Sequence, residues 1–276
     1  MIDTIKMSVA VQPLSVVEAN LVARMYYLSQ ATGMELHVEP EVTWFTSDIA
    51  YPSYIFNMVL QNRFTSLDSV YRHIDRILDE VTQRRLPLMW NTTPSTQPSY
   101  LGYHLEANGF EHVMTGQGMI LDLAHLNEAQ SMPAGLTIER VRTLAQLEDF
   151  VHVLAKNANM PADVEQAWLE KEICLGFDVY IPRQRYLGTL YGEPVATSTL
   201  FSGAGVAGLY HVATLPQARG KGIGSAISLV AMQDARWLGH RTATLISTPV
   251  GINIYSQLGF KPLEQYELYR WNGAQR

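Results

Sequence analysis

The chain has 276 residues, enough for one large domain or for two domains of about 100 to 150 residues each. Hydrophobic residues make up 47% of it and charged residues 17%, which is typical of a globular protein, and no apolar run approaches the length of a membrane span. A net charge of −6 argues against nonspecific nucleic-acid binding, so we expect neither a nucleic-acid nor a membrane partner.

The N-terminal sequence MIDTIKMSVAVQPL lacks the basic start and apolar run of a signal peptide, which favours a cytoplasmic location. Cys174 is the single cysteine, so an intrachain disulfide is excluded. The eight histidines are scattered, without the spacing of paired metal ligands, and we therefore predict no metal site. Nothing in the sequence distinguishes a monomer from a homodimer.

The first half of the chain predicts alternating helices and strands. A helix is expected over Leu14 to Ala31, ended by Gly33, and strands are expected over Val38 to Leu60. Apolar residues in Ser66 to Arg85 recur at helical spacing, and the run LPLMW that follows is typical of a buried strand. The segment Ala124 to Gly135 has turn residues and no sustained period, so we interpret it as a linker.

The second half begins again with the strand LTIERV and two helices, over 144–158 and 161–175. Its later strands are expected at 185–191, 194–201, 206–215, 242–247 and 266–271. A helix that ends at Gly239 precedes the fourth of these strands, and a short helix at 250–258 precedes the last. This half therefore also alternates strands with helices.

A repeat is visible at an offset of 150 residues. LGYHLEANGF at 101–110 aligns with GINIYSQLGF at 251–260, and each follows a long amphipathic helix, a short apolar strand and a loop. This order predicts two copies of one unit, although two unrelated segments of this common kind are an alternative. We divide the chain into a domain at 1–125, a linker at 126–134 and a domain at 135–276.

Three glycines cluster in LPQARGKGIGSAI, residues 215–227, where a helix is expected to begin. Glycine destabilises a helix by about 1 kcal/mol relative to alanine, so the cluster indicates that something must approach this backbone. Leu215 stands where a Walker loop needs glycine, and Ser225 stands where the dinucleotide fingerprint needs one, so both motifs are excluded. The bare amides of a helix N-terminus bind phosphate, and we predict a phosphate-binding loop; a tight turn without a ligand is the alternative.

The turn YGEPVATSTL, the strand LYHVATLP leading into RGKGIGSAI, and IYSQLGF follow one another within residues 135–276. In this order they resemble the GCN5-related N-acetyltransferases (GNAT), which transfer an acetyl group from acetyl-CoA to primary amines. The resemblance implies an α/β (α+β) protein of two tandem GNAT-like domains, each a mixed, mostly antiparallel twisted sheet flanked by helices. The first half looks like a degenerate copy without a cofactor loop.

The resemblance also implies an acetyl-CoA site in the second half. The coenzyme A pyrophosphate would lie on the loop formed by Arg219, Gly220, Lys221, Gly222, Ile223, Gly224 and Ser225. The glycines remove Cβ atoms that would keep a diphosphate from the amides, and Arg219 and Lys221 would supply countercharge, with a solvated Lys221 as the alternative. The backbone of Val212 and Thr214 would pair with the pantetheine arm, and one of their N–H groups would face the acetyl oxygen.

By the same resemblance, Tyr255 in IYSQLGF would donate a proton to the departing thiolate. A phenol with a pKa of about 10 is protonated at neutral pH. The glutamate that some GNAT members use as general base falls on Gly208, so His211 is the nearest titratable substitute. A water chain or an amine that arrives neutral are alternatives, and both Tyr255 and His211 have a purely structural alternative.

These residues predict direct acetyl transfer to a small-molecule amine in a ternary complex with acetyl-CoA. An acyl-CoA sensor without turnover, and protein or peptide acetylation, are the alternatives. One acetyl-CoA per chain is expected, because Leu105 stands opposite Tyr255 in the repeat. The corresponding loop of the first half reads QNRFTSLDS, without glycine, and Phe64 would crowd it.

Overall fold

The computed structural model of the protein describes residues 14–178 and 181–273. Its strands join in one 11-stranded mixed sheet, in the order β1-β2-β3-β4-β11-β5-β10-β9-β8-β7-β6. The first half contributes α1 (Val16–Leu28), β1 (Met34–Val38), β2 (Val42–Ser47), β3 (Met58–Asn62), α2 (Leu67–Gln83), β4 (Leu88–Thr92), α3 (Leu101–Ala107) and β5 (Glu111–Asp122). The second half contributes β6 (Leu136–Arg140), α4 (Leu144–Asn157), α5 (Ala162–Cys174), β7 (Arg183–Leu190), β8 (Glu193–Gly203), β9 (Val206–Thr214), α6 (Ile223–Trp237), β10 (Thr242–Ser247), α7 (Ile252–Leu258) and β11 (Lys261–Trp271).

The predicted helices form where the sequence supplies caps. Ser15 accepts the N–H of Glu18 to begin α1, and Ser66 begins α2 in the same way. Thr143 begins α4 with a reciprocal capping box. Two boundaries were wrong. The closing strand, expected at 266–271, begins at Lys261, because the segment beside β5 continues the ladder across a bulge. Strands were expected only from Val38, but β1 already occupies Met34–Val38, because it pairs with β2 as a hairpin.

The two halves repeat one topology. Each half begins its sheet with antiparallel strands, and the last of these is followed by a long helix and then by a parallel strand. Helix α2 joins β3 to its parallel neighbour β4, and α6 joins β9 to its parallel neighbour β10. A short helix, α3 or α7, and a last long strand, β5 or β11, then complete each half. The repeated order of elements that the sequence predicts is therefore present.

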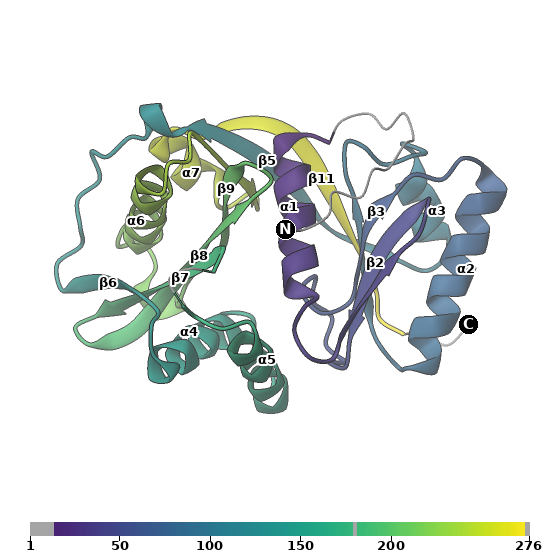
Figure 1. Ribbon diagram of the computed structural model, residues 1–276, viewed down its shortest axis with the longest axis horizontal. Helices are drawn as coiled ribbons and strands as arrows, with labels where there is room; N and C mark the ends of the chain where they lie inside the picture. The colour runs from purple at the N-terminus through teal and green to yellow at the C-terminus, as the bar shows by residue number, and fades with distance from the viewer. Residues whose placement is uncertain (1–13, 179–180, 274–276) are drawn as a thin grey trace.

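The last strands are exchanged between the halves. Strand β5 comes from the first half but pairs along β10, from Asp122 opposite Thr242 to Gln117 opposite Ser247. Strand β11 comes from the second half but lies between β4 and β5, with Trp271 opposite Leu88. In Figure 1, β11 runs in yellow from the lobe of α6 and α7 toward that of β3 and α3. The hydrogen-bond ladder is thus continuous across the predicted domain boundary.

Helix α1 lies between the two lobes (Figure 1) and joins them. Its apolar side packs on first-half residues such as Phe45 and Leu60. Toward the second half, the side-chain amide of Asn20 donates to the carbonyl of Gly203 at 2.9 Å, and Asn20 accepts the hydroxyl of Tyr210 at 2.7 Å. A Cβ at Gly208 would meet Asn20 Oδ1 at 2.0 Å, so a side chain of the first half covers the β9 backbone at this position.

We predict that Trp271→Ala costs about 3–5 kcal/mol of unfolding free energy and leaves a single unfolding transition. Trp271 belongs to the last strand of the second half, but it is 3% exposed and packs in the core of the first half with α2. Urea unfolding followed by circular dichroism measures the change. Trp237→Ala is the matched control, because Trp237 is 79% exposed, and its effect should stay within about 0.5 kcal/mol. Two separate transitions in the Trp271 variant would contradict the coupling of the halves.

Candidate functional site

Strands β9 and β10 pair in parallel only at Ala207 opposite Ala243 and Gly208 opposite Thr244. Beyond these pairs the two strands separate, so the later part of β9 has no ladder partner in β10. A cavity of about 560 Å³ opens there, lined by Asn157, Val212, Ala213, Thr214, Ala218, Arg219, Gly220, Gly222, Ile223, Gly224, Ser225, Thr248, Val250, Gly251, Ile254 and Tyr255. An open strand edge inside a cavity provides hydrogen-bonding groups for an extended ligand.

The glycine loop forms one wall of this cavity. Gly220 and Gly222 have φ of 76° and 78°, the left-handed region that favours glycine. Gly222 is the N-cap of α6, and no side chain within the described residues caps that helix. The first N–H groups of α6 are thus left for a ligand. The structure brings together all the predicted cofactor residues except Lys221, which is exposed and does not line the cavity.

Arg219 holds the loop in place. Its Nε donates to the carbonyl of Thr214 at 3.0 Å, and one of its terminal nitrogens donates to Asn157 Oδ1 at 2.9 Å. These bonds connect the loop to the end of β9 and to the last residue of α4. Sequence reasoning gave Arg219 a countercharge role, and the structure adds this bracing role.

A β-bulge in β9 adjoins the cavity. The register with β8 shifts between Thr197 and Thr199, so that one extra residue of β9 is accommodated. His211 adopts φ of 50°, which is unusual for a side chain other than glycine, and its carbonyl accepts the hydroxyl of Thr197 at 2.8 Å. The bulge precedes Val212, whose backbone lines the cavity.

Tyr255 reaches the cavity from α7. Its ring packs edge-on against Phe260, with 6.1 Å between the ring centroids. A Cβ at Gly251 would lie 3.0 Å from the Tyr255 ring, so glycine at the start of the helix makes room for it. Burial, and to a smaller extent Tyr54, raises the pKa of Tyr255 to about 12. The phenol therefore carries its proton across the neutral range.

His211 does not line the cavity but points between the two halves. Its Nε2 contacts a terminal nitrogen of Arg24 from α1 at 2.9 Å, and its Nδ1 lies 3.3 Å from Arg183. Burial, then the charges of Arg24 and Arg183, lower the pKa of His211 well below its usual value. A neutral ring whose acceptor nitrogen receives an arginine N–H is poorly placed to take a proton from an amine, so the environment disfavours the predicted role as general base.

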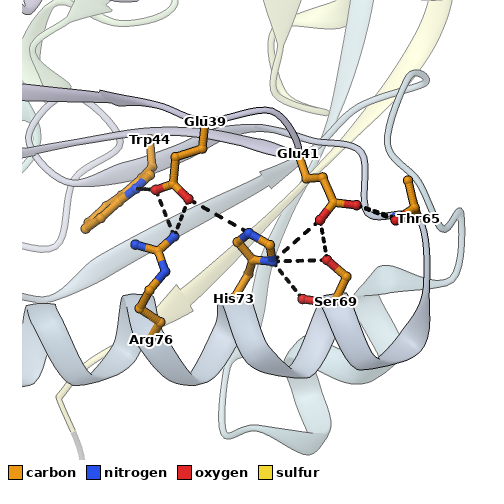
Figure 2. Close-up of polar contacts among 7 residues, drawn as sticks. All are labelled: Glu39, Glu41, Trp44, Thr65, Ser69, His73 and Arg76. Carbon is orange, nitrogen blue, oxygen red and sulfur yellow. Dashed lines mark hydrogen bonds and ion pairs between the residues drawn. The ribbon is translucent and has the colours of Figure 1, made fainter.

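The corresponding loop of the first half is closed. Phe64 is buried in the core of that half, and the carboxylate of Glu41 lies at the start of α2 (Figure 2). Glu41 accepts the backbone N–H of Thr65 at 2.8 Å, the Thr65 hydroxyl at 2.6 Å, and the Ser69 hydroxyl. The chain's own carboxylate thus takes the position at a helix N-terminus where an external anion would bind.

Several cavity residues were missed by sequence reasoning. Asn157 ends α4, Thr248 and Val250 lie in the segment between β10 and α7, and Ile254 belongs to α7. They carry no spacing signal, because they meet only when α4 and α7 fold over the same edge of β9. The loop after β10 could have been found from its place next to Tyr255 in the repeat.

Neither a family model nor a curated protein matches this chain. Solved structures do. A GCN5-related N-acetyltransferase from Kribbella flavida superposes with a TM-score of 0.70 at 18% identity, covering 94% of this chain and 96% of that one. The fold is that of the GCN5-related N-acetyltransferases.

Two further structures extend this likeness. A GCN5-related N-acetyltransferase from Sphaerobacter thermophilus gives a TM-score of 0.60 at 16% identity, covering 95% of each chain. A tandem GNAT protein from the clavulanic acid biosynthesis pathway gives 0.59 at 12% identity, covering 89% of this chain and 85% of that one. The predicted tandem GNAT-like fold is confirmed. In the described part of the chain no helix is long and apolar enough to cross a bilayer.

We predict that Glu41→Gln lowers the unfolding free energy by about 1 kcal/mol at neutral pH, because α2 loses the charge at its N-terminus. Hydrogen bonds from Ser69 and Thr65 lower the pKa of Glu41 to about 2. An unfolded glutamate titrates near 4.3, so the contribution is complete above about pH 5 and is lost as the pH falls toward 2.

Urea unfolding at several pH values measures the difference between the wild type and this variant. Glu111→Gln is the control, since Glu111 pairs with Arg270 on the surface, where its own side chain is 60% exposed. A difference for Glu41→Gln that stays constant from pH 7 to pH 3 would refute the anchoring role of this carboxylate.

Proposed function

We propose that the protein is an acetyl-CoA-dependent N-acetyltransferase that acts on a small amine. The observation that carries this proposal is the cavity in which an open edge of β9, an uncapped glycine-rich helix N-terminus and Tyr255 meet. Each of the three provides a different requirement of acetyl transfer: a strand partner for an extended arm, amides for a diphosphate, and a proton donor.

The residues present fit acetyl-CoA. Left-handed glycines keep the first amides of α6 accessible, and a Cβ at Gly222 would find its nearest neighbour, Pro133, only at 3.9 Å. The loop therefore has open space in front of it for a diphosphate. Val212 and Thr214 present backbone groups along the unpaired edge of β9 for the pantetheine arm. When bound, acetyl-CoA supplies the thioester whose acetyl group is transferred.

The chain's own groups would then assist the attack of the amine. A backbone N–H of Val212 or of Thr214 would stabilise the negative charge that develops on the acetyl oxygen. Tyr255, which remains protonated at neutral pH, would donate its proton to the leaving sulfur when the carbon–sulfur bond breaks, after the carbon–nitrogen bond has formed. The proton that the amine loses leaves to solvent, because Gly208 offers no carboxylate and His211 is held by Arg24.

Two other functions remain alternatives. A sensor of acyl-CoA would need the loop but not a phenol in the same cavity beside the open strand edge, so the position of Tyr255 favours the enzyme. Acetylation of proteins or peptides would require the acceptor side to admit a chain segment. Helix α1 packs against β8, β9 and β10 on the side of Gly208, which favours a small acceptor.

We predict that Gly222→Val abolishes acetyl-CoA binding, because valine is strained at φ of 78° and its side chain would stand in front of the amides of α6. Isothermal titration calorimetry should give one acetyl-CoA per wild-type chain and none for the variant. Gly205→Val is the matched control, because Gly205 has φ of 77° in an open turn between β8 and β9. This variant should lose stability through the same backbone strain but keep its affinity for acetyl-CoA. Unchanged affinity in Gly222→Val, or two sites in the wild type, would contradict the site assignment.

We predict that Tyr255→Phe lowers kcat by ~10² or more while the acetyl-CoA dissociation constant changes little. The phenylalanine ring keeps the packing on Phe260 and removes only the hydroxyl proton. Release of free coenzyme A thiol, followed with a panel of amines, measures turnover. A variant with the wild-type kcat would return Tyr255 to a structural role.

A further inference from the structure

Three arginines are buried together where α1 meets the second half. Arg24, Arg183 and Arg185 are at most 2% exposed, and one buried carboxylate, Glu172, pairs with Arg183 and Arg185. Glu172 accepts from Arg183 and, at 2.8 Å, from Nε of Arg185. Burial would raise the pKa of Glu172, but the charges of Arg183 and Arg185 hold it below its usual range. Glu172 therefore remains charged and balances one of the three guanidiniums.

Arg24 is the arginine without a carboxylate partner in this group. One terminal nitrogen contacts His211 at 2.9 Å, and the guanidinium lies 4.4 Å above the centre of the Tyr210 ring. Nε of Arg24 is buried and has no hydrogen-bond partner among residues 14–178 and 181–273. The contacts with His211 and Tyr210 are attractive, but neither residue carries a negative charge at neutral pH. Nε of Arg183 is likewise buried and unpartnered.

An excess of two buried positive charges is costly without an anion. Isolated charges in a protein interior cost several kcal/mol each, and the structures that retain them pair them or use them. An arginine fork matches a carboxylate, which can accept two parallel N–H bonds. The unpartnered Nε of Arg24 and its excess charge thus provide two independent indications of an anionic ligand.

This cluster adjoins the proposed site of acetyl transfer. His211, which contacts Arg24, immediately precedes Val212 on the cavity wall. Arg24 is therefore separated from the cavity wall by one residue of β9, His211, and residues of both halves meet at that position.

We infer that the acceptor is an amine that also bears a carboxylate, with the carboxylate bound by Arg24 of the first half and the amine presented toward Tyr255. This inference rests on the acetyltransferase function proposed above. Arg24 has no exposed surface, so binding of an acceptor carboxylate requires a local rearrangement of the side chains around it. Polycationic acceptors are disfavoured, because they would meet uncompensated positive charge.

The same charges account for the missing general base. A positive environment favours the neutral form of an amine and the ionised form of a carboxyl group. An amino carboxylate would therefore bind with its carboxylate charged and its amine more easily deprotonated, the proton passing to water. No side chain at position 208 is then required.

The test compares matched acceptors on the wild-type protein. The common amino acids, β-alanine and 4-aminobutyrate are each assayed beside the corresponding amide, with spermidine as a cationic acceptor. We expect kcat/KM to be at least about 10-fold higher for the preferred carboxylate than for its amide, as a charge-assisted bond provides. The comparison works against the expected result. The amine of an α-amino amide is less basic than that of the amino acid, so more of it is in the neutral, reactive form, and without a carboxylate site the amide would be the better acceptor. The preferred carboxylate should also raise the melting temperature of the protein, and its amide should not.

Arg24→Met tests the assigned residue. Methionine keeps much of the length of the side chain and removes excess buried charge, so the fold should be retained, which circular dichroism and acetyl-CoA affinity verify. The variant should lose the preference for the carboxylate in both kcat/KM and melting temperature. Arg84→Met, which removes a surface arginine that pairs with Glu35, should keep it.

The outcomes separate the two proposals. Equal kcat/KM for carboxylates and amides, preference for spermidine, or a preference that persists in Arg24→Met would overturn the inference while leaving an acetyltransferase. If acetyl-CoA does not bind, or no amine is acetylated, the proposed function fails. The melting-temperature comparison needs no turnover, so it still decides whether Arg24 binds a carboxylate.

Discussion

The exchange of β5 and β11 between the halves is the constraint on which the rest of the structure depends. Backbone groups of a sheet must find partners, and here β4 finds them in β11, and β10 in β5, so that each half completes the ladder of the other. The two repeats therefore form one sheet with a fixed relative position. That fixed position brings α1 of the first half against β8 and β9 of the second, next to the open edge that forms the candidate site.

The two long crossover helices show how one backbone geometry gives a site in one repeat and none in the other. Both α2 and α6 follow a strand and begin with free N–H groups and a positive dipole end. At α6, glycines leave that end open toward a cavity. At α2, Glu41 crosses from the end of the β1–β2 hairpin and supplies the negative charge internally. A carboxylate of the chain itself thus balances the positive end of α2. In the proposed function, the diphosphate of a ligand balances the positive end of α6.

The first half acts on the site through two contacts of α1. Asn20 closes over Gly208, so a carboxylate at that position has no room. Arg24 reaches His211 at the bulge and brings a positive charge that Glu172 does not balance. These contacts connect the absence of a carboxylate base with the presence of excess arginine charge. In the proposed reaction, the carboxylate of the acceptor balances the excess arginine charge. That positive charge in turn favours the neutral form of the amine, so no carboxylate base is needed.

The sequence by itself determined most of the elements, the repeat and the glycine loop, because each depends on residues near one another in the chain: caps, helical spacing, and a turn that favours glycine. The resemblance to the GNAT family, and no local pattern, implied that Tyr255 lies beside that loop. It did not determine that the last strands are exchanged, since the alternation in β5 and β11 fits either neighbour. It also suggested His211 as a base, and Arg24 gave no signal, because the burial and charge that govern both arise only when α1 packs on β9. Local propensity specifies the parts of this protein, whereas long-range pairing and desolvation decide which charges meet at the site.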